Sequence, residues 1–165
     1  MRIRLATNRD LDTVMAIYDG ARAYMKETGN PTQWAGGYPS RELIEDDIAR
    51  GCCHLVVDDD SILGVFYFAV EDDPTYRCIF DGSWLSDAPY AVIHRIAVAR
   101  HGCGVAKFCF DYAFAQHPSI RIDTHRDNLP MQRALAKNGF SYCGVIYLAN
   151  GEERIAYQKV GGEAK

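Results

Sequence analysis

Residues 91–106 read AVIHRIAVARHGCGVA. The first eight form an apolar run rich in β-branched side chains, which predicts a buried strand. A glycine-containing turn follows directly, and the spacing of Val105, Phe108 and Tyr112 after this turn favours a helix. Successive backbone N–H groups at a strand–turn–helix junction point into one concavity, and the helix N-terminus adds positive potential. The segment therefore predicts a phosphate-binding turn.

Two glycines, Gly102 and Gly104, let a ligand approach the backbone of this turn, because a Cβ atom at either position would block it. A glycine pair is common in tight turns, so it is weak evidence by itself. The turn lacks both the G-x-x-x-x-G-K-[ST] pattern of P-loop ATPases and the G-x-G-x-x-G pattern of dinucleotide-binding domains. These two classes of nucleotide-binding protein are therefore excluded.

Four ordered segments resemble the GCN5-related N-acetyltransferase (GNAT) family, most closely between Tyr90 and Lys159. His101–Ala106 is similar to its [QR]-x-x-G-x-[GA] motif, which cradles the pyrophosphate of coenzyme A. Asp123–Asn128 resembles its strand-to-helix passage, and Asn128–Phe140 resembles its N-x-x-A-x-x-x-Y-x-x-x-G-F signature. Arg4–Asp10 is similar to its opening R-x-A-x-x-x-D. The chain is identified as a member of this family.

Length and composition agree with one domain over residues 1–165, since domains commonly have about 100–200 residues. Hydrophobic residues make up 48% of the chain, which suffices for a core without metal or disulfides. No apolar run reaches the roughly 18 residues of a membrane span, and the N-terminus lacks a hydrophobic signal core. We therefore expect a cytoplasmic protein that does not bind a membrane.

Hydrophobic periodicity predicts helices mixed with strands that are mostly linked as hairpins. We expect strands at Ile3–Leu5, Cys53–Val57, Ile62–Val70, Ala91–Val98, Ile120–Thr124, Tyr142–Ala149 and Arg154–Lys159, with Thr75–Phe80 either another strand or an irregular lid. Helices are expected from near Asp10 to Thr28, after a cap at Ser40, after the phosphate-binding turn, and over Asn128–Asn138. The fold class is α+β, with one central mixed and mostly antiparallel sheet flanked by helices, as the GNAT resemblance also implies.

The formal net charge of −4 disfavours a nucleic-acid partner, because such proteins normally show a basic footprint. The charge is unevenly distributed along the chain. Residues 40–90 carry three basic and twelve acidic side chains, whereas residues 91–165 carry ten basic and six acidic ones. The acidic middle predicts attraction of a cationic acceptor. It also counts against a transferase that acts on aminoacyl-tRNA. A homodimer is compatible with the sequence.

The six cysteines contain no C-x-x-C pair, and the five histidines lack the spacing of metal ligands. We expect the cysteines to be reduced and mostly buried, and we expect no metal ion. A zinc hydrolase is a poor match.

Acetyl transfer to an amine needs a base, since only roughly one lysine-like amine in 2,500 is neutral at pH 7. His94 is the predicted catalytic base, because imidazole changes charge near neutral pH and arylalkylamine acetyltransferases resemble the chain at this position. The alternative is a core histidine bonded to the backbone. His125 is a second candidate base, while Asp123 and Asp127 are expected to cap the following helix.

The resemblance implies acetyl-CoA as the acyl donor and a small-molecule or peptide amine as the acceptor. It assigns donor binding to the main chain of the strand before the turn, to the turn itself and to the next helix cap: Ile96, Ala97, Val98, His101, Gly102, Cys103, Gly104, Val105, Ala106 and Asn128. It assigns acceptor binding to the loop between the first two helices: Gln33, Trp34 and Tyr38. A backbone N–H of Ile93–Val98 would bind the oxyanion.

Leu135 stands where the family signature has a tyrosine that often protonates the leaving thiolate. Tyr142, Tyr147 and Tyr157 in the final hairpin are other hydroxyl candidates for this role. The missing tyrosine leaves a second function open, namely a non-catalytic module that senses acyl-CoA.

Overall fold

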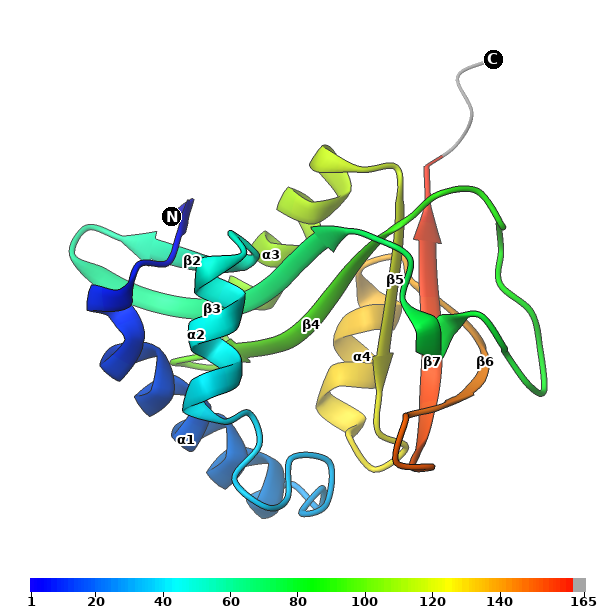
Figure 1. Ribbon diagram of the computed structural model, residues 1–165, viewed down its shortest axis with the longest axis horizontal. Helices are drawn as coiled ribbons and strands as arrows, with labels where there is room; N and C mark the ends of the chain where they lie inside the picture. Colours follow the sequence, from blue (N-terminus) through cyan, green and yellow to red (C-terminus); the bar gives the residue numbers. More distant parts are fainter. Residues whose placement is uncertain (162–165) are drawn as a thin grey trace.

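A seven-stranded sheet in the order β1-β2-β3-β4-β5-β7-β6 lies at the centre of the computed structural model (Figure 1). Its strands are β1 Arg2–Leu5, β2 Cys53–Asp58, β3 Ser61–Val70, β4 Ala91–Val98, β5 Ser119–Thr124, β6 Ser141–Tyr147 and β7 Glu153–Val160. All neighbouring strands are antiparallel except β4 and β5, which are parallel. The predicted α+β class and mixed sheet are confirmed. The structure describes residues 1–161, so the end of the predicted domain at Lys165 lies outside the described residues.

Four helices flank the sheet: α1 Leu11–Glu27, α2 Arg41–Ala49, α3 Val105–Gln116 and α4 Leu129–Lys137. Apolar side chains of α1 and α2 share one core with Leu55 and Val65 of the sheet. Those of α3 and α4 share another core with Val56 and Phe66. Since successive strand residues point to opposite faces, the two helix pairs cover opposite faces, with α2 in front and α3 behind in Figure 1.

The parting of β4 from β5 creates the gap that holds the candidate site. The two strands pair only at Ala91–Ile120 and Val92–Arg121, and they then diverge, as Figure 1 shows. The remaining six residues of β4, Ile93–Val98, therefore have no strand partner on that side within residues 1–161. The backbone polar groups on that side are available to a ligand, except where another residue uses them, as the Tyr18 hydroxyl uses the Arg95 oxygen.

A bulge bends β4 inside this unpaired stretch. The register with β3 shifts between Val65 and Tyr67, and Arg95 adopts a φ of 50°. A positive φ is uncommon for a residue with a bulky side chain, so the surrounding contacts must hold it.

The structure adds local detail to the expected elements. A 3-10 turn over Asn8–Asp10 precedes α1, because Asp10 accepts hydrogen bonds from Thr7 N–H (2.8 Å) and from the Arg4 guanidinium (2.8 Å). Leu5 is half exposed. Of the two alternatives for Thr75–Phe80, the irregular one holds: a 3-10 turn ends at Tyr76, and only Phe80 bridges to a strand.

The cysteines are free thiols within the described residues, but only half are buried: Cys53, Cys109 and Cys143. Cys78 and Cys103 are exposed. No group of three or more His, Cys, Asp or Glu side chains in residues 1–161 is arranged to hold a metal ion. No helix in the described part of the chain has the length and apolar character needed to cross a membrane.

Candidate active site

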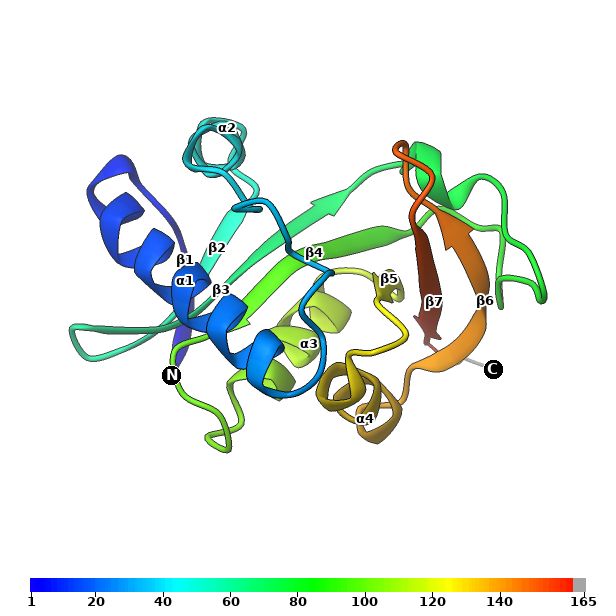
Figure 2. The same ribbon diagram turned by 90° about the horizontal axis from the view of Figure 1, so that it is seen from below.

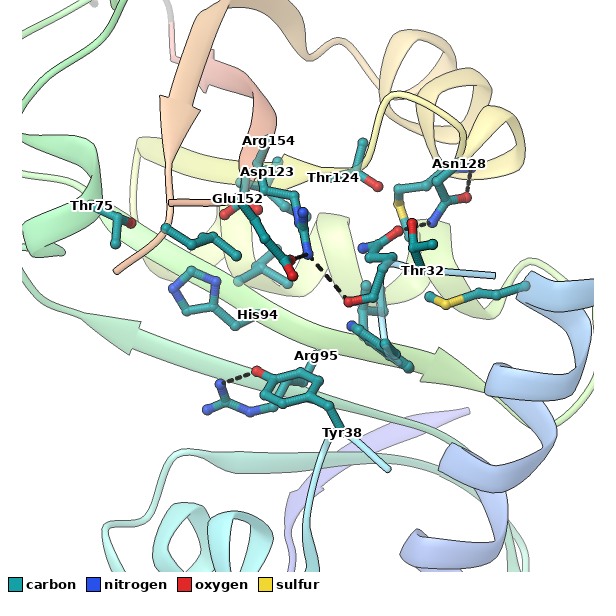
Figure 3. Close-up of a pocket in the computed structure, with 18 of the residues that line it drawn as sticks. Thr32, Tyr38, Thr75, His94, Arg95, Asp123, Thr124, Asn128, Glu152 and Arg154 are labelled. Carbon is teal, nitrogen blue, oxygen red and sulfur yellow. Dashed lines mark hydrogen bonds and ion pairs between the residues drawn. The ribbon is translucent and has the colours of Figure 1, made fainter. Parts of the chain in front are cut away.

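A cavity of about 370 Å³ opens where β4 and β5 part. Figure 3 shows His94 and Arg95 of β4, Asp123 and Thr124 of β5, and Arg154 of β7 around it. The end of α1, the α1–α2 loop, the segment between β3 and β4, the start of α4 and the β6–β7 loop complete the walls. The cavity therefore lies beside the unpaired edge of β4.

His94 lines this cavity and is held by Asp73, which follows β3. The Nε2 atom of His94 lies 2.8 Å from Asp73 Oδ2, while Oδ1 accepts from Thr75 N–H (2.9 Å) and Thr75 Oγ1 (2.7 Å). Burial opposes the charge of Asp73, but the hydrogen bonds from His94 and Thr75 outweigh it and lower the pKa of Asp73 to about 2.

The ionised Asp73 can only accept hydrogen bonds. The Nε2 atom of His94 therefore carries a hydrogen and donates a hydrogen bond to Asp73. In the neutral ring Nδ1 then has a free lone pair, and no partner for Nδ1 occurs within residues 1–161. The predicted catalytic histidine is thus oriented as a proton acceptor. No pattern in the sequence identifies Asp73, because its run of acidic residues is typical of a solvated turn.

Asp123 also lines the cavity, and its Oδ2 accepts a 2.6 Å hydrogen bond from the hydroxyl of Tyr76. The centroids of the Tyr76 and His94 rings lie 5.9 Å apart, so Tyr76 lies between Asp123 and His94. The expectation that Asp123 and Asp127 cap α4 was wrong. Asn128 is the cap instead, and its Oδ1 accepts from Met131 N–H at 3.2 Å.

The predicted acceptor residue Gln33 is an anchor of the α1–α2 loop. Its Oε1 accepts hydrogen bonds from Asn30 (2.7 Å) and from Asn128 (2.9 Å), and its backbone oxygen accepts from Arg154 (3.2 Å). Figure 2 shows the loop crossing from α1 past α4 before it returns to α2. Gln33 and Asn128 both line the cavity, and their predicted ligand contacts stay predictions.

Trp34 and Tyr38 of the same loop lie in the cavity wall near the β4 bulge. The Trp34 ring is buried and meets Tyr18 edge to face with centroids 5.7 Å apart. The Tyr38 hydroxyl accepts a 3.3 Å hydrogen bond from Arg95, drawn in Figure 3. The loop is therefore fixed to β4 as well as to α4.

The predicted phosphate-binding turn has the required open backbone. Gly102 and Gly104 have φ values of 79° and 73°, and a Cβ atom built on either would meet nothing within 4 Å. The backbone N–H groups of residues 100–106 find no acceptor within the described chain. His101 stacks on Tyr24 of α1 with ring centroids 3.6 Å apart, which fixes the turn against that helix. Backbone N–H groups and open space together form a cradle for an anion.

An acetyltransferase of the GNAT family from Streptococcus agalactiae is 34% identical to this chain, with a TM-score of 0.89 over 98% of this chain and 96% of that chain. The chain belongs to the GNAT family. A candidate acetyltransferase from Staphylococcus aureus is 26% identical, with a TM-score of 0.70 over 97% and 99% of the two chains. A GNAT acetyltransferase from Listeria monocytogenes shares the fold at 22% identity, with a TM-score of 0.70 over 96% of this chain and 94% of that chain. No family model and no curated protein matches the chain.

GNAT enzymes transfer acyl groups and use acetyl-CoA. The residues present fit this donor: the open N–H groups of residues 100–106 suit its pyrophosphate, and the unpaired edge of β4 suits its extended pantetheine arm. Of the predicted donor residues, Ile96 lines the cavity, while Ala97 is buried in the core under α1. Val105 points into the core under α3, and Cys103 is exposed.

The remaining candidates for a proton donor or a base do not line this cavity. Leu135 is fully buried in the core between α3, α4 and the sheet. None of the three tyrosines of the final hairpin lines the cavity: Tyr142, Tyr147 and Tyr157. His125 lines a neighbouring cavity, where its Nδ1 accepts from Asp127 N–H at 3.0 Å and its Nε2 lies 3.3 Å from the Thr32 hydroxyl.

Proposed function

We propose that the protein is an N-acetyltransferase that moves an acetyl group from acetyl-CoA to a primary amine of a small molecule or peptide. The observation that carries this proposal is the pair of His94 and Asp73 in the cavity where β4 and β5 part. A partly buried carboxylate that orients an imidazole with one free nitrogen is an arrangement suited to a general base.

Acetyl-CoA would supply an acyl group activated as a thioester. The backbone N–H groups of residues 100–106 would bind its pyrophosphate, with help from the positive end of α3. The unpaired main chain of Ile93–Val98 would bind the pantetheine amides and provide an N–H donor for the carbonyl oxygen. These two segments contain every predicted donor residue except Asn128.

His94 would remove the proton of the acceptor amine. An alkyl amine is almost entirely protonated at pH 7 and cannot attack a carbonyl in that form. Nδ1 of His94 would take the proton, and the carboxylate of Asp73 would stabilise the resulting imidazolium through Nε2. No side-chain acid is needed at position 135, because a thiol with a pKa of about 8.5 leaves largely unassisted.

The test is to incubate the protein with acetyl-CoA and a panel of primary amines and to follow the release of free coenzyme A. Turnover with at least one amine supports the proposal, provided that His94→Ala loses it. Coenzyme A binding by calorimetry without turnover on any amine would instead support the acyl-CoA-sensing module.

A further inference from the structure

The charged side chains of the cavity wall are matched in pairs with one exception. Arg95 is bound by Asp47, and Arg154 lies 3.0 Å from Glu152. Asp73 is matched by His94. The remaining carboxylate, Asp123, has no basic partner within 4 Å among residues 1–161.

The only protein donor to Asp123 within the described residues is the neutral hydroxyl of Tyr76, which occupies Oδ2. Oδ1 receives no hydrogen bond from residues 1–161. Asp123 is half-buried, and a carboxylate in such a setting interacts more strongly with a cation than it would in water. The next residue, Thr124, lines the same cavity and has a buried hydroxyl oxygen without a partner in the described chain.

We propose that Asp123 binds a positively charged group of the acceptor that is separate from the amine that reacts. The acceptor class is then a diamine or another amine with a second cationic group, and this inference rests on the proposed function. A carboxylate that bound the reacting ammonium would stabilise its charged form and oppose proton loss to His94. A second cationic group avoids this conflict, because Asp123 holds one end of the acceptor while His94 acts on the other.

The acidic segment 40–90, on which the sequence-based expectation of a cationic acceptor rested, contributes a single carboxylate, Asp73, to the cavity wall. That carboxylate is already matched by His94. The attraction for a cation therefore comes from Asp123 on β5, which lies in the segment with a positive charge balance.

The test uses three amines that share a four-carbon chain and one primary amine but differ at the far end. 1,4-Diaminobutane has an ammonium there, n-butylamine a methyl group, and 4-aminobutanoate a carboxylate. The wild-type kcat/KM should be highest for the diamine, by roughly tenfold or more, because a hydrogen-bonded charge pair contributes about that factor. It should be lowest for 4-aminobutanoate.

Asp123→Asn keeps an acceptor for Tyr76 but removes the charge. It should abolish the preference for the diamine over n-butylamine, mainly through KM. This ratio is independent of the fraction of folded protein. Asp127→Asn, which changes an exposed carboxylate outside this cavity, should keep the preference.

The outcomes separate the two proposals. Acetylation of n-butylamine and the diamine at equal rates, or an unchanged preference in Asp123→Asn, overturns the role of Asp123 and leaves the acetyltransferase intact. A best substrate with a carboxylate at the far end also overturns it. Absence of turnover with every amine rejects the proposed function, and the role of Asp123 as an acceptor site with it.

Discussion

Asp47 of α2 binds Arg95 of β4 through two hydrogen bonds, of 2.8 and 2.9 Å, in the buried space beneath the α1–α2 loop. The hydroxyl of Tyr18 also donates to the backbone oxygen of Arg95 at 2.7 Å, and the guanidinium lies 4.7 Å from the Tyr67 ring centroid. These contacts hold Arg95 at its positive φ and thereby fix the bulge beside His94.

Asp47→Ala should therefore destabilise the protein by about 3–5 kcal/mol, because it leaves a buried guanidinium unpaired. Chemical denaturation measures this loss. Asp46→Ala removes an exposed carboxylate one residue away and should cost less than about 1 kcal/mol. Equal stability of the two variants would show that the buried pair does not hold β4.

The low pKa of Asp73 predicts a defined acid dependence of stability. The folded pKa of about 2 lies below the ordinary value of 3.8, so the stabilisation is complete above about pH 5 and is lost as the pH falls toward 2. A shift of this size corresponds to about 2 kcal/mol. Denaturation at pH 6 and at pH 2.5 should show a smaller stability difference for Asp73→Asn than for the wild type. An equal loss of stability between pH 6 and pH 2.5 in the wild type and in Asp73→Asn would contradict the lowered pKa of Asp73.

His94→Ala should lower kcat near pH 7 by about 10²–10⁴-fold, which is the usual contribution of a general base. Activity should recover partly at high pH, where the amine is already neutral. His125→Ala is the matched control and should keep kcat, because His125 lies outside the cavity of about 370 Å³. Wild-type kcat across pH 6–9 in His94→Ala would make this histidine a purely structural residue.

Gly104→Val should weaken coenzyme A binding by roughly tenfold or more, because it places a branched side chain in the open space of the anion cradle. Gly29→Val is the matched control. Gly29 also has a positive φ, 90°, with nothing within 4 Å of a built Cβ, so the backbone strain is similar but lies outside the cradle. Calorimetry that finds equal affinity for the two folded variants would remove the donor site from this turn.

Leu135→Tyr should destabilise the protein by about 1–3 kcal/mol, because Leu135 is fully buried and a tyrosine ring would overpack the core around it. From the sequence alone, we expect the rate of this variant to be unchanged or modestly raised. Chemical denaturation measures the predicted loss of stability. Unchanged stability would show that the core under α4 can repack.

The sequence predicted the fold and the location of His94 on β4 because both have local signals; the role of His94 as a base stays a prediction. The apolar run of β4 and the glycines after it identify a strand, a turn and a helix, and His94 lies within that run. The partner of His94 has no such signal. Asp73 lies 21 residues earlier and reaches His94 only because β3 and β4 are antiparallel.

Two other residues show why side-chain roles are harder to predict. Gln33 has the amide of a ligand-binding residue, but its oxygen is used by Asn30 and Asn128 to fix the loop. Arg95 occupies a backbone conformation that arginine rarely adopts. Only the tertiary contacts with Asp47 and Tyr18 explain it.

The short pairing of β4 with β5 has a geometric consequence. Two residue pairs, Ala91–Ile120 and Val92–Arg121, join a half-sheet of four strands to a half-sheet of three. His94 and Asp123 each lie two residues beyond the pair Val92–Arg121, on the two strands that diverge there. The angle between the two half-sheets therefore sets the distance between the candidate base and the carboxylate without a basic partner.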